Sequence, residues 1–282
     1  MEETNPHIRV GLVAYMNVQP LVWAFHKGLI SPTTPDGRRM VFFSEIPRLL
    51  ANSLREGRCH VGIVPVYEYF AGPEYSILPA GAIATKQRVG SVLIVANAPL
   101  ENLEFVVLDP ASLTSVNLLR LLHAEFGWRF KLVEYPLSDD PMHAADWLSQ
   151  THRPAGQLLI GDPALAAYAR VPYVYDLGSL WYELTGLPFV FAAWLVSPAI
   201  GDVPLLETFT RARKLGEVHL DEVARECAPV FGFAADFASR YFRENLHFAL
   251  GDDEIAGLRE FGRLLAHHGL IESPRELRFY MR

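Results

Sequence analysis

The sequence is poor in cysteine and in positive charge. Its 282 residues include two cysteines, Cys59 and Cys227, too few for a disulfide framework and without the spacing of a metal site. This scarcity fits a reducing cytoplasm. Lys and Arg number 25 against 32 Asp and Glu, so the formal net charge is −7, and no basic stripe offsets it. A nucleic-acid-binding function is therefore disfavoured.

The chain also lacks long apolar runs. The run at residues 187–196 (LPFVFAAWLV) is among the longest, and it is far shorter than the roughly 20 residues that a spanning helix needs. The N-terminus, MEETNPHIRV, has neither the basic nor the apolar region of a secretory signal. Half of the residues are nevertheless hydrophobic, enough for a large core. We expect a globular cytoplasmic protein that binds neither membranes nor nucleic acids.

Predicted strands and helices alternate along the chain. The expected strands are residues 8–13, 40–43, 60–64, 91–96, 105–108, 130–134, 157–160, 173–176 and 189–196. The expected helices are residues 20–27, 45–56, 115–125, 141–149, 164–169, 203–216, 219–228, 233–245 and 252–268. This order favours an α/β fold in which helices cover parallel sheets.

The two α/β parts match a two-lobe plan in which the chain leaves the first lobe, builds the second and returns. We expect the first lobe at residues 1–96, the second at 97–192, and the return to the first at 193–282. Ligands bind such folds at the carboxyl ends of the parallel strands. The loops expected at the cleft are residues 15–19, 65–69, 112–115 and 161–163.

A cluster of hydroxyl residues precedes the helix predicted at 115–125. Ser112, Thr114 and Ser115 follow the apolar strand and the Asp109-Pro110 turn. Backbone N–H groups at a helix start carry partial positive charge, and hydroxyls add neutral donors. In an acidic chain this pattern indicates a site for a carboxylate or phosphate. Alternatively, one hydroxyl caps the helix and the others are solvated.

Several motifs at these loops resemble a menaquinone-pathway family. In chain order they are YMNVQPL (15–21), VGIVPVYEYF (61–70), EYSILP (74–79), SVLIVANAPLENL (91–103), LDPASLTSVNLL (108–119), LLIGDPAL (158–165) and DLGSLWYELTGLPFVFAAW (176–194). Together they closely resemble the chorismate dehydratases of the futalosine route. The resemblance implies a type II periplasmic-binding-protein-like fold with a cleft between two lobes. It also implies a cytoplasmic lyase that needs no metal or organic cofactor.

The implied reaction removes the C3 proton and the C4 hydroxyl of chorismate, and the ring becomes aromatic. The product is 3-[(1-carboxyvinyl)oxy]benzoate. Chorismate carries two carboxylates, so we expect two anion sites: the hydroxyl cluster, and Ser91 with the backbone of residues 85–90.

Asn17 and Ser91 are the candidate catalytic residues. The Asn17 amide can donate and accept, so it could hold the C4 hydroxyl or orient the enolpyruvyl group. In the plainer interpretation, Asn17 sits in a turn and bonds its own backbone.

The remaining candidate substrate-binding residues are Tyr15, Pro65, Gly161 and Asp162. Tyr15 and Pro65 could wall the substrate ring, and Gly161 would permit close backbone approach. Asp162 could face the cleft, but a carboxylate would repel a dianion, so we expect it to cap the following helix.

No histidine lies in the matching loops, and Glu68 is the nearest candidate carboxylate for the general base. We therefore hypothesise that the enolpyruvyl carboxylate of the substrate takes the C3 proton.

Three other functions remain open from the sequence. A solute receptor shares the fold but normally carries a signal or lipid anchor. A sister enzyme of the same pathway would have different cleft motifs, and a ligand sensor would need an appended DNA-binding segment. Apolar surface on the C-terminal helices could support a homodimer.

Overall fold

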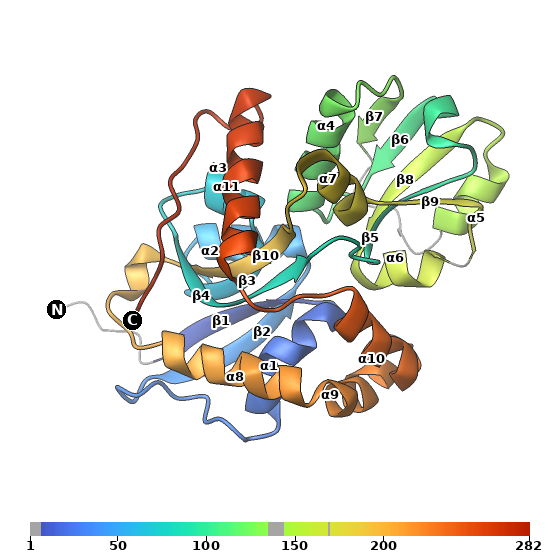
Figure 1. The fold of residues 1–282 in the computed structure, drawn as a ribbon. Helices are drawn as coiled ribbons and strands as arrows, with labels where there is room; N and C mark the ends of the chain where they lie inside the picture. Colours follow the sequence, from blue (N-terminus) through green and yellow to red (C-terminus); the bar gives the residue numbers. More distant parts are fainter. Residues whose placement is uncertain (1–6, 135–143, 169) are drawn as a thin grey trace.

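The computed structural model describes residues 7–134, 144–168 and 170–282. Within them, the strands form two five-stranded sheets, in the orders β2-β1-β3-β10-β4 and β7-β6-β8-β5-β9. Figure 1 shows the sheets in two lobes, each with its own helices. The predicted two-lobe α/β fold is confirmed. The polar N-terminal segment 1–6 and the start of the helix predicted at 141–149 lie outside the described residues.

The first sheet combines parallel strands with two antiparallel ones. Strands β1 (His7–Val13), β2 (Arg39–Glu45) and β3 (Val61–Pro65) are parallel. Strand β10 (Phe189–Val196) runs antiparallel between β3 and β4 (Ser76–Thr85). Every residue of β10 is buried, which explains its unbroken apolar sequence.

The second sheet has the same mixed character. Strand β6 (Phe105–Leu108) pairs in parallel with β7 (Lys131–Glu134) and β8 (Ala155–Ile160). Strand β5 (Val92–Ala96) lies antiparallel to β8 and also pairs with β9 (Tyr173–Asp176). The parallel strands of both lobes end toward the space between them, as the cleft prediction requires.

Helices cover both sheets. In the first part of the chain these are α1 (Gln19–His26), α2 (Pro47–Arg55) and α3 (Tyr67–Ala71). The second lobe has α4 (Thr114–Glu125), α5 (Ala144–Gln150), α6 (Gly161–Ala167) and α7 (Leu177–Thr185). After β10 come α8 (Leu206–Val218), α9 (Leu220–Cys227), α10 (Ala235–Glu244) and α11 (Asp252–His267). In Figure 1, α8 lies along α1, and α9 and α10 continue beneath the second lobe.

The chain crosses between the lobes earlier than residues 96 and 192. Strand β5 is already bonded in the second sheet, and β10 is bonded in the first sheet from Phe189. The crossings are therefore residues 86–91 and 186–188. Both strands are fully buried, so their apolar sequences fit either sheet and do not mark the boundary.

Helix α8 packs closely on α1 at a glycine. A Cβ atom at Gly216 would lie 1.7 Å from the carbonyl oxygen of Pro20. The two backbones can approach this closely only because Gly216 has no side chain.

We predict that Gly216→Ala destabilises the protein. Alanine normally favours a helix interior by about 1 kcal/mol over glycine, but here its methyl group must push α8 from α1. We expect the free energy of unfolding to fall by about 2–3 kcal/mol, measured by urea denaturation. Val218→Ala, on the same helix at a side chain that is 75% exposed, is the control and should change little. A Gly216→Ala protein as stable as wild type would contradict this packing.

Candidate active site

A small cavity of about 60 Å³ lies between the lobes. Its lining residues are Val13, Tyr15, Asn17, Pro47, Pro65, Ile83, Val92, Ser112, Thr114, Ser115, Ile160, Gly161, Phe191 and Ala192. None of these side chains is charged. All the predicted site residues line this cavity except Ser91 and Asp162, which adjoin it in sequence through Val92 and Gly161. The structure thus brings the strand-end loops of both lobes together, while their roles remain predictions.

The predicted anion site lies at the start of α4. The Ser112 Oγ accepts a hydrogen bond from the Ser115 N–H at 3.2 Å, so one hydroxyl does cap the first turn. The Thr114 Oγ1 accepts from the N–H of Tyr67, in the other lobe, at 3.1 Å. A hydroxyl that accepts an N–H still has its own proton to donate. The capping bond therefore leaves this cluster able to bind an anion.

Gly161 and Tyr15 form a close contact between the lobes. Gly161 has a φ of +63°, and a Cβ atom there would lie 2.6 Å from the Tyr15 ring. Its N–H donates to the Ser91 carbonyl at 2.8 Å. The backbone of Gly161 thus lies against the Tyr15 ring, and its approach to a ligand stays a prediction.

The prediction that Asp162 caps the following helix is wrong. Helix α6 begins at Gly161, so Asp162 lies inside its first turn. Its carboxylate instead accepts from the Met16 N–H in the other lobe, at 3.2 and 3.3 Å. Burial raises the pKa of Asp162 to about 6, although the Met16 N–H acts in the opposite direction.

Asn17 and Ser91 have different surroundings. The hydroxyl of Tyr241, on α10, donates to the Ser91 Oγ at 2.7 Å. The Asn17 Oδ1 is buried and has no partner among the described residues. Asn17 is therefore not a turn residue whose carbonyl bonds its own backbone.

Part of the second predicted anion site is already occupied by a carboxylate. The N–H groups of Val89 and Gly90 donate to Asp176 at 3.1 and 2.7 Å. Asp176 also accepts from Ser179 at the start of α7, at 3.0 Å. These two backbone donors are thus not free for a ligand, and the binding role of Ser91 and residues 85–88 stays a prediction.

Two further residues near the site, Arg48 and Tyr241, were not predicted from the sequence. Arg48, on α2, donates its N–H to the Ala111 carbonyl at 3.1 Å, and its guanidinium reaches the Ser112 carbonyl at 3.5 Å. Its Nε is buried without a partner in the described part of the chain. The positive charge lies behind the α4 start, where it favours an anion. Neither residue belongs to a motif that could have marked it.

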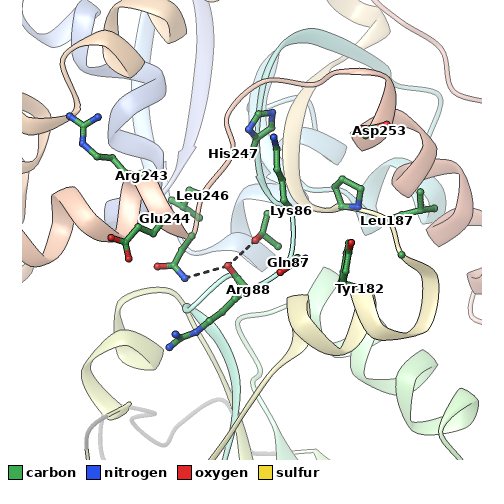
Figure 2. Close-up of a pocket in the computed structure, with 14 residues that line it drawn as sticks. Lys86, Gln87, Arg88, Tyr182, Leu187, Arg243, Glu244, Leu246, His247 and Asp253 are labelled. Carbon is green, nitrogen blue, oxygen red and sulfur yellow. Dashed lines mark hydrogen bonds between the residues drawn. The ribbon is translucent and has the colours of Figure 1, made fainter.

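A larger cavity of about 710 Å³ lies at the lobe crossings (Figure 2). It is lined by Lys86, Arg88, Arg243 and His247, and also by Glu244 and Asp253. Some of the cationic side chains are engaged elsewhere: Arg243 pairs with Asp221 at 2.9 Å, and in Figure 2 it points away from the cavity. The charges are mixed, and none of the four predicted cleft loops (residues 15–19, 65–69, 112–115 and 161–163) lines it. The cleft cavity is therefore the better candidate site.

No helix in the described ranges is both long and apolar enough to cross a membrane. In the same ranges no group of three or more His, Cys, Asp or Glu side chains is placed to hold a metal ion. Cys59 and Cys227 are both buried free thiols.

Comparison with known proteins gives consistent matches. Residues 8–267 match the model of a family described as menaquinone biosynthesis. A chorismate dehydratase of Thermus thermophilus is 31% identical over 284 positions, covering 93% of this chain and 96% of that protein. A chorismate dehydratase of Campylobacter jejuni is 31% identical over 185 positions, covering 64% of each.

Solved structures share the fold. A protein of Archaeoglobus fulgidus matches with a TM-score of 0.76 and 20% identity, covering 95% of this chain and 99% of that one. The periplasmic aliphatic sulphonate binding protein of Escherichia coli matches with a TM-score of 0.64 and 18% identity, covering 98% and 92%. The periplasmic-binding-protein-like fold expected from the sequence is confirmed.

We predict that Asp162→Asn changes how stability depends on pH. Because the pKa of Asp162 is raised from 3.8 to about 6, the folded protein binds more protons than the unfolded chain between these values. This carboxyl therefore makes the protein less stable as pH rises from about 4 to 6. Relative to wild type, the free energy of unfolding of Asp162→Asn should rise by about 1–2 kcal/mol from pH 4 to pH 7.

Asp36→Asn is the control for this pH series. The pKa of Asp36 is lowered by its hydrogen bonds from Arg38 and Thr34. Its carboxylate therefore stabilises the folded state at neutral pH, and this contribution disappears as pH falls. The control should change in the opposite direction, and a flat profile for Asp162→Asn would show that burial does not raise the pKa of Asp162.

Proposed function

Because the chain belongs to the menaquinone-biosynthesis family, we propose that it is an enzyme that dehydrates chorismate to 3-[(1-carboxyvinyl)oxy]benzoate. It is then a carbon–oxygen hydro-lyase. The observation that carries this function is the match to a chorismate dehydratase along 93% of the chain. The cleft supports it, because the strand-end loops with the family's motifs line one cavity. We also propose a cytoplasmic location, which the two free cysteines fit.

The reaction breaks two bonds on neighbouring ring carbons. The electrons of the C3–H bond become part of the aromatic ring, and the C4 oxygen leaves and is protonated to water. Negative charge develops in the ring and its carboxylate as the C3 proton leaves. Hydroxyl and N–H donors at the start of α4 would stabilise that charge when the carboxylate binds there. Hydrogen bonds of this kind are strong in a largely apolar cavity.

The lining offers little that could act as a base. No His, Lys, Asp or Glu side chain lines the cavity in the described structure. Burial, with Asp109 and Asp162 nearby, raises the pKa of Tyr15 well above its usual range, so Tyr15 keeps its proton at neutral pH. Glu68 is bonded to Arg55 at 2.6 Å and to the Tyr75 hydroxyl. These contacts support the substrate's own enolpyruvyl carboxylate as the base.

We expect the purified protein to convert chorismate to an aromatic product that is one water lighter, without added metal or cofactor. Asn17→Ala and Ser91→Ala should each lower the rate by about 100-fold, because each removes a polar group at the reacting atoms. Mass spectrometry and ultraviolet absorbance follow the reaction. The control is Ser53→Ala, which should leave the rate unchanged. It also removes a buried hydroxyl, one that bonds Glu45 at 2.6 Å. Binding without turnover would indicate a receptor instead.

A chorismate analogue without the enolpyruvyl carboxylate tests the base. We expect it to bind as a competitive inhibitor and to lose water at least about 100-fold more slowly, because the proton acceptor is missing. Asp162→Asn, assayed with chorismate itself, is the companion experiment and should keep most of the activity. If the analogue reacts normally while Asp162→Asn is inactive, Asp162 is the base.

A further inference from the structure

The Tyr241 hydroxyl contacts the candidate catalytic residue Ser91. Tyr241 lies on α10 and is 3% exposed. Its hydroxyl is 2.7 Å from the Ser91 Oγ. Ser91 immediately precedes β5. One phenol from the C-terminal helices therefore holds a side chain of the crossing that enters the second lobe.

The direction of this hydrogen bond decides what Ser91 can still do. A tyrosine hydroxyl has one proton, and here it is donated to the Ser91 Oγ. Ser91, which accepts from Tyr241, keeps its own proton for another acceptor.

The result is a donor, the Ser91 O–H, held at a fixed position. A substrate hydroxyl can accept such a hydrogen bond. The proposed substrate has one hydroxyl, at C4, and it is the group that leaves.

We propose that Tyr241 is a positioning residue that orients Ser91 toward the C4 hydroxyl of chorismate. The inference rests on the proposed function. The Ser91 O–H donates to the C4 oxygen as negative charge develops on it. Tyr241 touches neither substrate nor reacting atoms. It acts by holding the Ser91 Oγ, so that the Ser91 proton is directed to the substrate.

Tyr69 makes a useful contrast. It is also buried, at 1% exposed, but its hydroxyl donates to the Glu276 carbonyl and accepts from the Arg278 N–H, at 2.7 and 2.8 Å. These partners are backbone groups in the C-terminal tail, so this tyrosine anchors the tail. Tyr69→Phe therefore removes a buried phenol hydroxyl with no consequence for the cleft.

The test compares Tyr241→Phe with Tyr69→Phe in steady-state dehydration of chorismate. We expect Tyr241→Phe to lower kcat about tenfold and to leave KM within about threefold, because the anion site is unchanged. Tyr69→Phe should lower Tm about as much as Tyr241→Phe does, because each loses one buried hydroxyl. It should leave kcat unchanged. In a Ser91→Ala background, measured in long incubations, Tyr241→Phe should cost less than about twofold, since its main partner is gone.

Three results would overturn the inference. They are an unchanged kcat in Tyr241→Phe, an equal loss of kcat in Tyr69→Phe, and an undiminished loss in the Ser91→Ala background. In each case an active wild-type enzyme leaves the proposed function standing. A wild-type protein that does not convert chorismate overturns the proposed function itself, and this inference with it.

Discussion

The candidate site depends on the contact between the Tyr15 ring and the backbone of Gly161. Only glycine fits there, because its φ is positive and a Cβ atom would overlap the ring. The contact brings the start of α6 against the loop after β1, so the Asp162 carboxylate reaches the Met16 N–H. The same glycine donates its N–H to the Ser91 carbonyl. Loops from two lobes become one cavity because these groups meet.

In the proposed function the cavity must admit a dianion, although the protein itself is acidic. Its lining is uncharged, and Asp109 and Asp162, which are both close to Tyr15, have pKa values raised to about 6 by burial. We therefore propose that a dianionic substrate is held by hydroxyls and backbone N–H groups at the start of α4, with Arg48 behind them. Short-range hydrogen bonds of this kind select the position of a carboxylate more strictly than a flexible lysine would.

Much of the fold and part of the site could be predicted from the sequence. Apolar strands followed by Tyr15, Pro65 and the hydroxyl cluster are local patterns, and the parallel arrangement places their ends together. The errors are also local. Helix α6 begins at Gly161, three residues earlier than expected, so Asp162 lies inside the helix and does not cap it. Strand β4 was missed because its alanines and glycine are weak strand formers that tertiary packing overrides. Tyr241 could not be found, since its partner Ser91 is 150 residues away.

The most direct test is the crystal structure of the wild-type protein with its proposed product, 3-[(1-carboxyvinyl)oxy]benzoate. The account predicts the product in the cleft cavity, with one carboxylate within about 3.2 Å of the hydroxyls at the start of α4. The aromatic ring should lie beside Tyr15, with the former C4 position toward Asn17. A product bound instead in the cavity at the lobe crossings, against Lys86 and Arg88, would contradict the account.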